Sequence, residues 1–253
     1  RRDNRVHRGR TGSVMSEQTV VIATQQYAHL ALLSSSIHYF WWTVKANSTM
    51  RADSRYTPSE GFETFPQPSI TARMDKAGRE LESARRFVML RDRIGLTELY
   101  NRVFSERVED SAVERLRQAH IEVDEAVRDA YAMDEEREPQ IREFEAKIAS
   151  DPLPSWREID FRNGFYETQQ GVRFTISPQA RVDVLDKLLA LNHYRYQQEV
   201  SQGLHSKKGG RKGAKTVKKQ PKGTGTGPST GADATDSADG AFDGLFAPPG
   251  ALF

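Results

Sequence analysis

An apolar pattern between residues 70 and 93 constrains the fold of this chain more than any other feature. The apolar side chains there are separated by alternating steps of four and three residues, which places them on one face of a helix. The members of this seam are Ile70, Met74, Ala77, Leu81, Ala84 and Val88. The sequence therefore predicts a long helix with a heptad-like seam, which a glycine at position 95 ends.

Five further segments show helical periodicity or a helix start signal. Asp110 or Ser111 can cap one helix, because their side-chain oxygens accept hydrogen bonds from the first free backbone amides. Ser177 followed by Pro178 is a second start, since proline suits the first helical position. The expected helices cover residues 25–44, 96–104, 110–131, 141–148 and 177–200.

Two short segments are predicted as β-strands. Val20 to Ala23 is rich in β-branched residues, and Val172 to Ile176 alternates apolar and polar side chains. Residues 161–171 are polar and predicted to be irregular, so the second strand needs another partner: the first strand, residues 47–68, or a sheet outside this chain. These elements predict a mainly α fold, a helical bundle-like body with a few short strands and a disordered C-terminal tail.

The net charge of +2 conceals an uneven distribution. Both ends of the chain are basic, whereas residues 11–200 hold 24 basic and 30 acidic side chains. Within this body, residues 45–93 have ten basic and seven acidic side chains, and residues 98–150 have eight and fifteen. If the protein binds nucleic acid, residues 45–93 are the electrostatically favoured part.

Composition excludes several kinds of site and location. The chain has no cysteine, which excludes disulfides and thiolate metal sites. It has no apolar run of membrane-spanning length, and the Arg-rich start lacks the apolar core of a secretory signal, so we expect a cytoplasmic protein. Residues 1–17 are expected to be a disordered or non-native leader, because the first methionine is Met15 and the opening suggests a fragment.

No catalytic constellation is recognisable. Neither a glycine-rich dinucleotide motif nor a phosphate-binding loop is present, and the six histidines lack metal-ligand spacing. His120 lies on an apolar helical face and is predicted to be a core residue, and the carboxylates of residues 98–150 are predicted to lie on exposed faces. The cluster from His193 to Tyr196 is explained equally by a site or by helix-end packing. We therefore expect no catalytic residue, cofactor site or metal site in this chain.

The segment from Asn47 to Pro68 is the best candidate for binding. It is rich in Ser, Thr, Pro and Gly, which stop a helix and form turns, and it carries two arginines beside aromatic rings. Arginine can make two parallel hydrogen bonds to phosphate or guanine. The alternative is an ordered loop without such a role. The aromatic run Tyr39 to Trp42 just before it is predicted to be core, with a base-stacking platform as the alternative.

The residues after Gly203 lack periodicity and combine Lys with Gly, Ser and Thr. They predict a disordered tail, which either attracts nucleic acid without sequence preference or is a solvated linker. The apolar residues near the end, such as Leu245-Phe246 and Leu252-Phe253, are a weak signal for docking on a partner.

Several short motifs, in a consistent order, resemble fused restriction–modification adenine methyltransferases of the MmeI-like type. Three of them resemble the end of the target-recognition domain of those enzymes: Ser34–His38 with Trp41-Trp42, Met50–Pro58, and Phe62–Pro66. Four resemble their helical C-terminal region: Gly95–Asn101, Leu116–Tyr131, Gly164–Ser177 and Leu188–Tyr196. The resemblance covers about residues 18–200 and implies a target-recognition end at 18–68, a helical C-terminal domain at 69–203 and a tail at 204–253.

The resemblance implies a DNA-binding piece of an enzyme that transfers methyl groups from S-adenosylmethionine to adenine N6. The cofactor motif and the Asn-Pro-Pro-Tyr motif of the family are not in this chain, so the cofactor is expected only in the parent enzyme. The expected partners are double-stranded DNA and a methyltransferase core on another chain, with no membrane. The predicted DNA-binding residues are Lys45, Arg51, Arg55, Tyr56 and Arg173. The alternatives are a helical protein-interaction module, built on the seam and the apolar tail, or a non-functional gene remnant.

Overall fold

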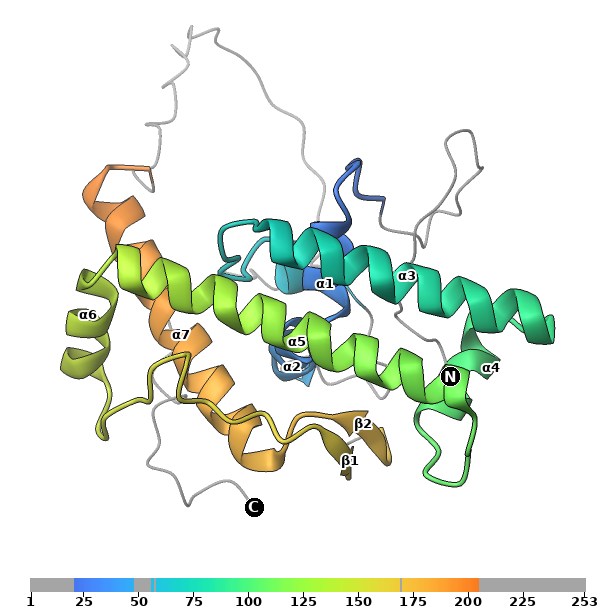
Figure 1. Cartoon of the computed structure of the whole chain (residues 1–253). Helices are drawn as coiled ribbons and strands as arrows, with labels where there is room; N and C mark the ends of the chain where they lie inside the picture. Colours follow the sequence, from blue (N-terminus) through green and yellow to red (C-terminus); the bar gives the residue numbers. More distant parts are fainter. Residues whose placement is uncertain (1–20, 48–55, 57, 169, 205–253) are drawn as a thin grey trace, which may run out of the picture. The chain divides into compact units, whose positions relative to one another are not determined.

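Two long helices, α3 (Ala72–Asp92) and α5 (Ser111–Arg137), run antiparallel beside each other in the computed structural model (Figure 1). The structure describes residues 21–47, 56, 58–168 and 170–204. The short helix α4 (Leu96–Val103) connects the pair. Ion pairs reflect the antiparallel arrangement. Arg73 at the start of α3 pairs with Asp129 in the later part of α5, and Arg91 at the end of α3 pairs with Asp110, the N-cap of α5, at 2.5 Å.

The helix starts that the sequence predicts are confirmed by hydrogen bonds. The Asp110 carboxylate accepts from the backbone amides of Ala112 at 2.8 Å and Val113 at 3.3 Å. The Ser177 hydroxyl accepts from Ala180 at the start of α7 (Pro178–Ser201). The predicted seam of α3 is buried except for Ile70, which precedes the helix and is 40% exposed.

The predicted helix over residues 25–44 is two helices, α1 (Tyr27–Ser34) and α2 (Ser36–Asn47). Ser35 separates them, with an extended backbone at ψ 153°. The residue before α1 does not cap it, whereas Ser35 caps α2, since its hydroxyl accepts from the His38 amide at 3.2 Å. Carboxylates from other helices act as remote caps at both starts: Asp75 of α3 for α1, and Asp124 of α5 for α2.

The two-stranded sheet differs from the prediction. Residues 21–23 form no strand, and Val20 lies outside the described residues. The strand β2 (Arg173–Thr175) pairs antiparallel with β1 (Gly164–Tyr166), in register Gly164 to Thr175. The partner therefore lies inside the stretch predicted to be irregular, because a short hairpin can form locally without a distant strand.

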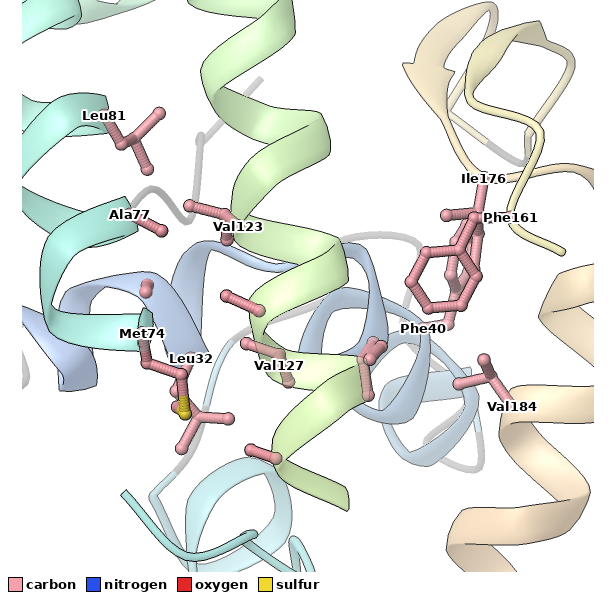
Figure 2. Close-up of a cluster of buried hydrophobic side chains, with 14 of the residues drawn as sticks. Leu32, Phe40, Met74, Ala77, Leu81, Val123, Val127, Phe161, Ile176 and Val184 are labelled. Carbon is pink, nitrogen blue, oxygen red and sulfur yellow. The ribbon is translucent and has the colours of Figure 1, made fainter. Parts of the chain in front are cut away.

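One hydrophobic core joins all parts of the described chain. Apolar side chains of α1, α2, α3, α5, α7 and the segments beside the hairpin meet there, and Figure 2 labels Leu32, Phe40, Met74, Ala77, Leu81, Val123, Val127, Phe161, Ile176 and Val184. The helix α6 (Gln140–Ile148) packs on α7, and a π-helical turn, η1 (Pro58–Phe62), packs on α2. The mainly α fold class is thus confirmed.

The described residues fall within one compact unit that ends at Leu204. Helices before and after residue 68 contribute to the same core, and the domain boundary there stays a prediction from the resemblance. The expected leader and the tail after Leu204 lie outside the described residues. Among the helices that the structure describes, none combines the length and the apolar character that crossing a membrane requires.

Candidate nucleic-acid interface

Two of the five predicted DNA-binding side chains are described by the structure. Tyr56 and Arg173 are both half-buried. Lys45 belongs to the last turn of α2, but its side chain is not described. Arg51 and Arg55 lie outside the described residues.

Tyr56 packs on α2 rather than standing free. Its ring centre lies 5.9 Å from that of Trp42 and 5.7 Å from that of His38. Its hydroxyl oxygen is 3.2 Å from His38 Nε2, and burial raises the pKa of Tyr56 to about 12. Gly61 covers the ring so closely that a Cβ at this position would lie 2.8 Å from Tyr56 Cε2. Tyr56 is therefore a packing residue in this structure, and its predicted contact with DNA stays untested.

The contacts of Tyr56 belong to a larger group, which we call the aromatic anchor. Its members are His38, Trp41, Trp42, Tyr56 and Phe65. His38 and Phe65 meet edge to face at 4.9 Å, and Trp41 lies 6.1 Å from Phe65. Because Trp41 and Trp42 are buried, the prediction that the aromatic run is core is confirmed.

The aromatic anchor fixes both sequence neighbours of residues 48–55 to one helix. Asn47 is the last residue of α2, and Tyr56 packs on Trp42 and His38 of the same helix. The turn η1 that follows also packs on α2. The residues on both sides of the segment that carries Arg51 and Arg55 therefore belong to α2 or pack on it.

Arg173 lies elsewhere in the fold and has its own contacts. Its guanidinium carbon is 4.4 Å from the ring centre of Phe104, and its Nη2 donates to Gln170 Oε1 at 3.0 Å. It contacts the end of α4, whereas Tyr56 contacts α2, so the described contacts do not unite the two residues in one site. Stacking on an aromatic ring explains the position of Arg173 without a ligand.

The cluster from His193 to Tyr196 is largely accounted for by packing. The Tyr194 ring lies 5.6 Å from the ring of Phe144 on α6. Arg195 Nη1 donates to the carbonyl oxygen of Gln67 at 2.7 Å. These contacts hold the end of α7 against its neighbours and favour helix-end packing over a site.

A set of buried carboxylates on α5 and α6 was not predicted from the sequence. The prediction that residues 98–150 carry only exposed carboxylates is wrong for Asp124, Asp134, Glu135 and Glu145, which are buried. Asp124 accepts from the Ser36 amide and hydroxyl, both at 2.7 Å, and from Asn163 Nδ2 at 3.1 Å. Burial raises the pKa of Asp124 to about 6. A local charge pattern could not reveal the burial of Asp124, because its hydrogen-bond partners Ser36 and Asn163 are distant in sequence.

Two histidines, buried His38 and half-buried His120, have the opposite shift. Burial lowers the pKa of His38 to about 4 and, with the charge of Arg85 nearby, that of His120 to about 3. The His120 Nε2 atom is 2.9 Å from the Tyr100 hydroxyl oxygen, which accepts from Arg85 Nε at 2.7 Å. The prediction that His120 is a packed, hydrogen-bonded residue is therefore confirmed.

These shifts predict how folding stability depends on pH. The raised pKa of Asp124 favours its protonated form in the fold, so its contribution is full below about pH 4 and is lost as the pH rises to about 6. The lowered pKa values of His38 and His120 favour neutral rings, whose contribution is lost as the pH falls below about 6.5. Two histidines outweigh one aspartate, so these three groups should make unfolding free energy rise between pH 4 and 6 by about 1.4 kcal/mol per pH unit.

Asp124→Asn should make this rise steeper, because it removes the opposing group. In urea unfolding across the same pH range, the slope should increase by up to about 1.4 kcal/mol per pH unit. A pH-independent loss should accompany it, since an amide cannot accept both hydrogen bonds from Ser36. An unchanged slope would show that Asp124 is ionised equally in the folded and unfolded chain.

The described residues give no further indication of a ligand. Among them, no group of three or more His, Asp or Glu side chains is arranged to hold a metal ion. Compared with known proteins, the chain matches no family model, no curated protein and no solved structure.

Proposed function

We propose that this chain is a DNA-contacting C-terminal part of an adenine-specific DNA methyltransferase from a restriction–modification system, without the catalytic core. The structural observation in its favour is the aromatic anchor, which holds both neighbours of the Arg51 and Arg55 segment on α2. The sequence motifs that resemble the family supply the enzyme class. On this proposal the protein acts in the cytoplasm, binds double-stranded DNA and works with a methyltransferase core on another chain that binds S-adenosylmethionine.

The proposed chemistry requires a firm grip on the duplex. A methyltransferase reaches adenine N6 by rotating the base out of the stack, which costs a few kcal/mol of lost pairing and stacking. Contacts to the flanking phosphates hold the distorted duplex in place during this step. Arginines on a segment whose ends are packed against a helix suit this role, because fewer residues have to be ordered when they bind.

The double substitution Arg51→Ala with Arg55→Ala tests the proposal. The dependence of log K on log salt should become shallower by up to about 1.8, because each lost phosphate contact reduces the slope by about 0.9. Binding of a fluorescent duplex, titrated at several salt concentrations, measures this slope. The matched control is Arg157→Ala with Arg162→Ala, which removes two exposed arginines paired with Glu136 and Asp160.

The control should leave the slope unchanged. If the Arg51 and Arg55 variant also leaves it unchanged, these residues do not contact phosphate. If the unmodified chain fails to bind duplex DNA at every salt concentration tested, the proposal fails and the gene-remnant alternative gains support. The protein-interaction alternative has lost its main surface, because the seam from Met74 to Val88 packs in the core of this chain.

A further inference from the structure

Asn163 is the only asparagine in the chain that is followed by glycine. Glycine has no Cβ, so the backbone nitrogen of Gly164 is unhindered toward the side chain before it. Asn163 precedes β1, belongs to no regular element and is only half-buried, so water can reach it. The backbone before it is irregular as well, because Arg162 has a left-handed φ of 42°. This asparagine is therefore open to chemical change in a way that the asparagines within helices are not.

The same side chain makes a hydrogen bond to a buried carboxylate. Asn163 Nδ2 donates to Asp124 Oδ2 at 3.1 Å. Asp124 also accepts from the amide and the hydroxyl of Ser36, and the Ser36 hydroxyl lies 3.0 Å from Thr175 Oγ1 on β2. Asp124 thus connects the hairpin and the residue before it to α5 and to the start of α2. Each of its partners in these contacts is a neutral donor.

We propose that Asn163 is a site of spontaneous deamidation, and that the carboxylate formed there releases the hairpin from Asp124. The backbone nitrogen of Gly164 attacks Asn163 Cγ, and a new C–N bond closes a cyclic imide. The side-chain nitrogen leaves as ammonia and takes up the proton that the backbone nitrogen loses. Water then opens the imide at either carbonyl and leaves aspartate or its β-linked isomer, so the net change is water consumed and ammonia released.

The product cannot keep the contact that asparagine makes. A carboxylate has no proton to donate, and it would stand at hydrogen-bond distance from a second, buried carboxylate. Within the described part of the chain, no ion pair supplies Asp124 with a cation that could offset the repulsion. The β-linked isomer also lengthens the backbone directly before β1. Both products therefore favour separation of the hairpin from α5.

Ageing the full chain in heavy-oxygen water tests whether the site is reactive. Heavy oxygen enters the new carboxyl group only when water opens the imide during the incubation, so loss of ammonia during later handling is not counted. Trypsin cleaves after Arg162 and Arg173, and fragmentation of the peptide between them locates the label by mass. Label should accumulate at Asn163 at least about tenfold faster than at Asn101 and Asn192, which precede arginine and histidine.

Gly164→Ala is the matched variant for this measurement. A Cβ at position 164 would come no closer than 3.4 Å to the Tyr166 ring, so the hairpin can accept it. The methyl group shields the attacking nitrogen, and labelling of Asn163 should fall to the rate of the two helical asparagines. Equal labelling of all three asparagines in the parent chain, or labelling that Gly164→Ala leaves unchanged, would overturn the proposed site.

Asn163→Asp reproduces one product and tests its effect on the fold. Amide hydrogen exchange in β1 and β2 should become at least about tenfold faster, whereas exchange in the middle of α3 should be unchanged. Asn163→Ala removes the same hydrogen bond without adding a charge, so its effect on the hairpin should be smaller. Exchange in Asn163→Asp that matches either the parent or Asn163→Ala would refute release by charge repulsion, and so would an equal increase in α3. Neither measurement depends on the proposed methyltransferase role.

Discussion

Gly78→Ala is expected to lower the free energy of unfolding by about 3 kcal/mol or more, although alanine is normally the better helix former. α1 approaches α3 at this glycine so closely that a Cβ would lie 2.1 Å from the carbonyl oxygen of Tyr27. The Tyr27 backbone cannot easily withdraw, because its amide donates to Asp75 of α3 at 2.7 Å. Relief of the clash therefore requires the two helices to separate and the core below them to open.

The sign of the effect makes this prediction decisive. At an unhindered helical position the same substitution would stabilise the chain by roughly 1 kcal/mol. Gly95→Ala is the control, because a Cβ there would meet no atom within 4 Å and only the loss of a glycine N-cap, about 1 kcal/mol or less, is expected. Urea unfolding followed by circular dichroism measures both variants. A Gly78→Ala protein as stable as the parent would show that α1 does not cross α3 at this point.

Lys187→Met should cost about 3 kcal/mol, because it leaves two buried carboxylates with the partly exposed Arg142 as their remaining cation. Lys187 has no exposed surface, and its Nζ atom pairs with Glu135 and lies 2.6 Å from Glu145 Oε1. Arg142 reaches Glu145 Oε2 at 2.9 Å from the solvent side. The backbone amide of Trp156 donates to Glu135 at 3.2 Å, so one charge network ties α5, α6, α7 and the loop before β1 together.

Two comparisons separate this effect from a general loss of charge. Arg157→Met breaks an exposed pair with Glu136 and should cost less than about 1 kcal/mol. Adding Glu135→Gln and Glu145→Gln to Lys187→Met should restore much of the lost stability, because no buried carboxylate remains unpaired. Unfolding free energies at neutral pH provide the measurement. A similar loss for Lys187→Met and Arg157→Met would contradict a buried network.

Elements whose signals are local could be predicted from the sequence. The seam of α3, the Asp110 cap of α5 and the Ser177-Pro178 start of α7 each depend on residues within a few positions of one another. The break at Ser35 and the hairpin partner of β2 could not, because the Ser35 cap of α2 is supported by a carboxylate from α5 and β1 has no alternating pattern. Long-range partners, rather than propensity, decide these features.

The residues of the candidate site also divide into those that local signals predict and those that depend on distant contacts. The aromatic run before residue 47 could be predicted as core from its bulk alone. The role of Tyr56 as an anchor could not, since it arises from contacts with His38 and Trp42 across a segment rich in turn residues. Buried Lys187 and Asp124 were missed for a similar reason, because a charged residue at a helical position is normally taken as solvent-exposed.

The remote caps have a consequence for the order in which the protein acquires structure during synthesis. The beginning of the described chain leaves the ribosome first. The carboxylates that cap its helices are synthesised later: Asp75 follows Tyr27 of α1 by 48 residues, and Asp124 follows Ser36 of α2 by 88 residues. Helices this short are marginal alone, so they gain stability only when the later helices emerge. We therefore expect α1 and α2 to become stable only after α3 and α5, which are synthesised later, are available to pack against them.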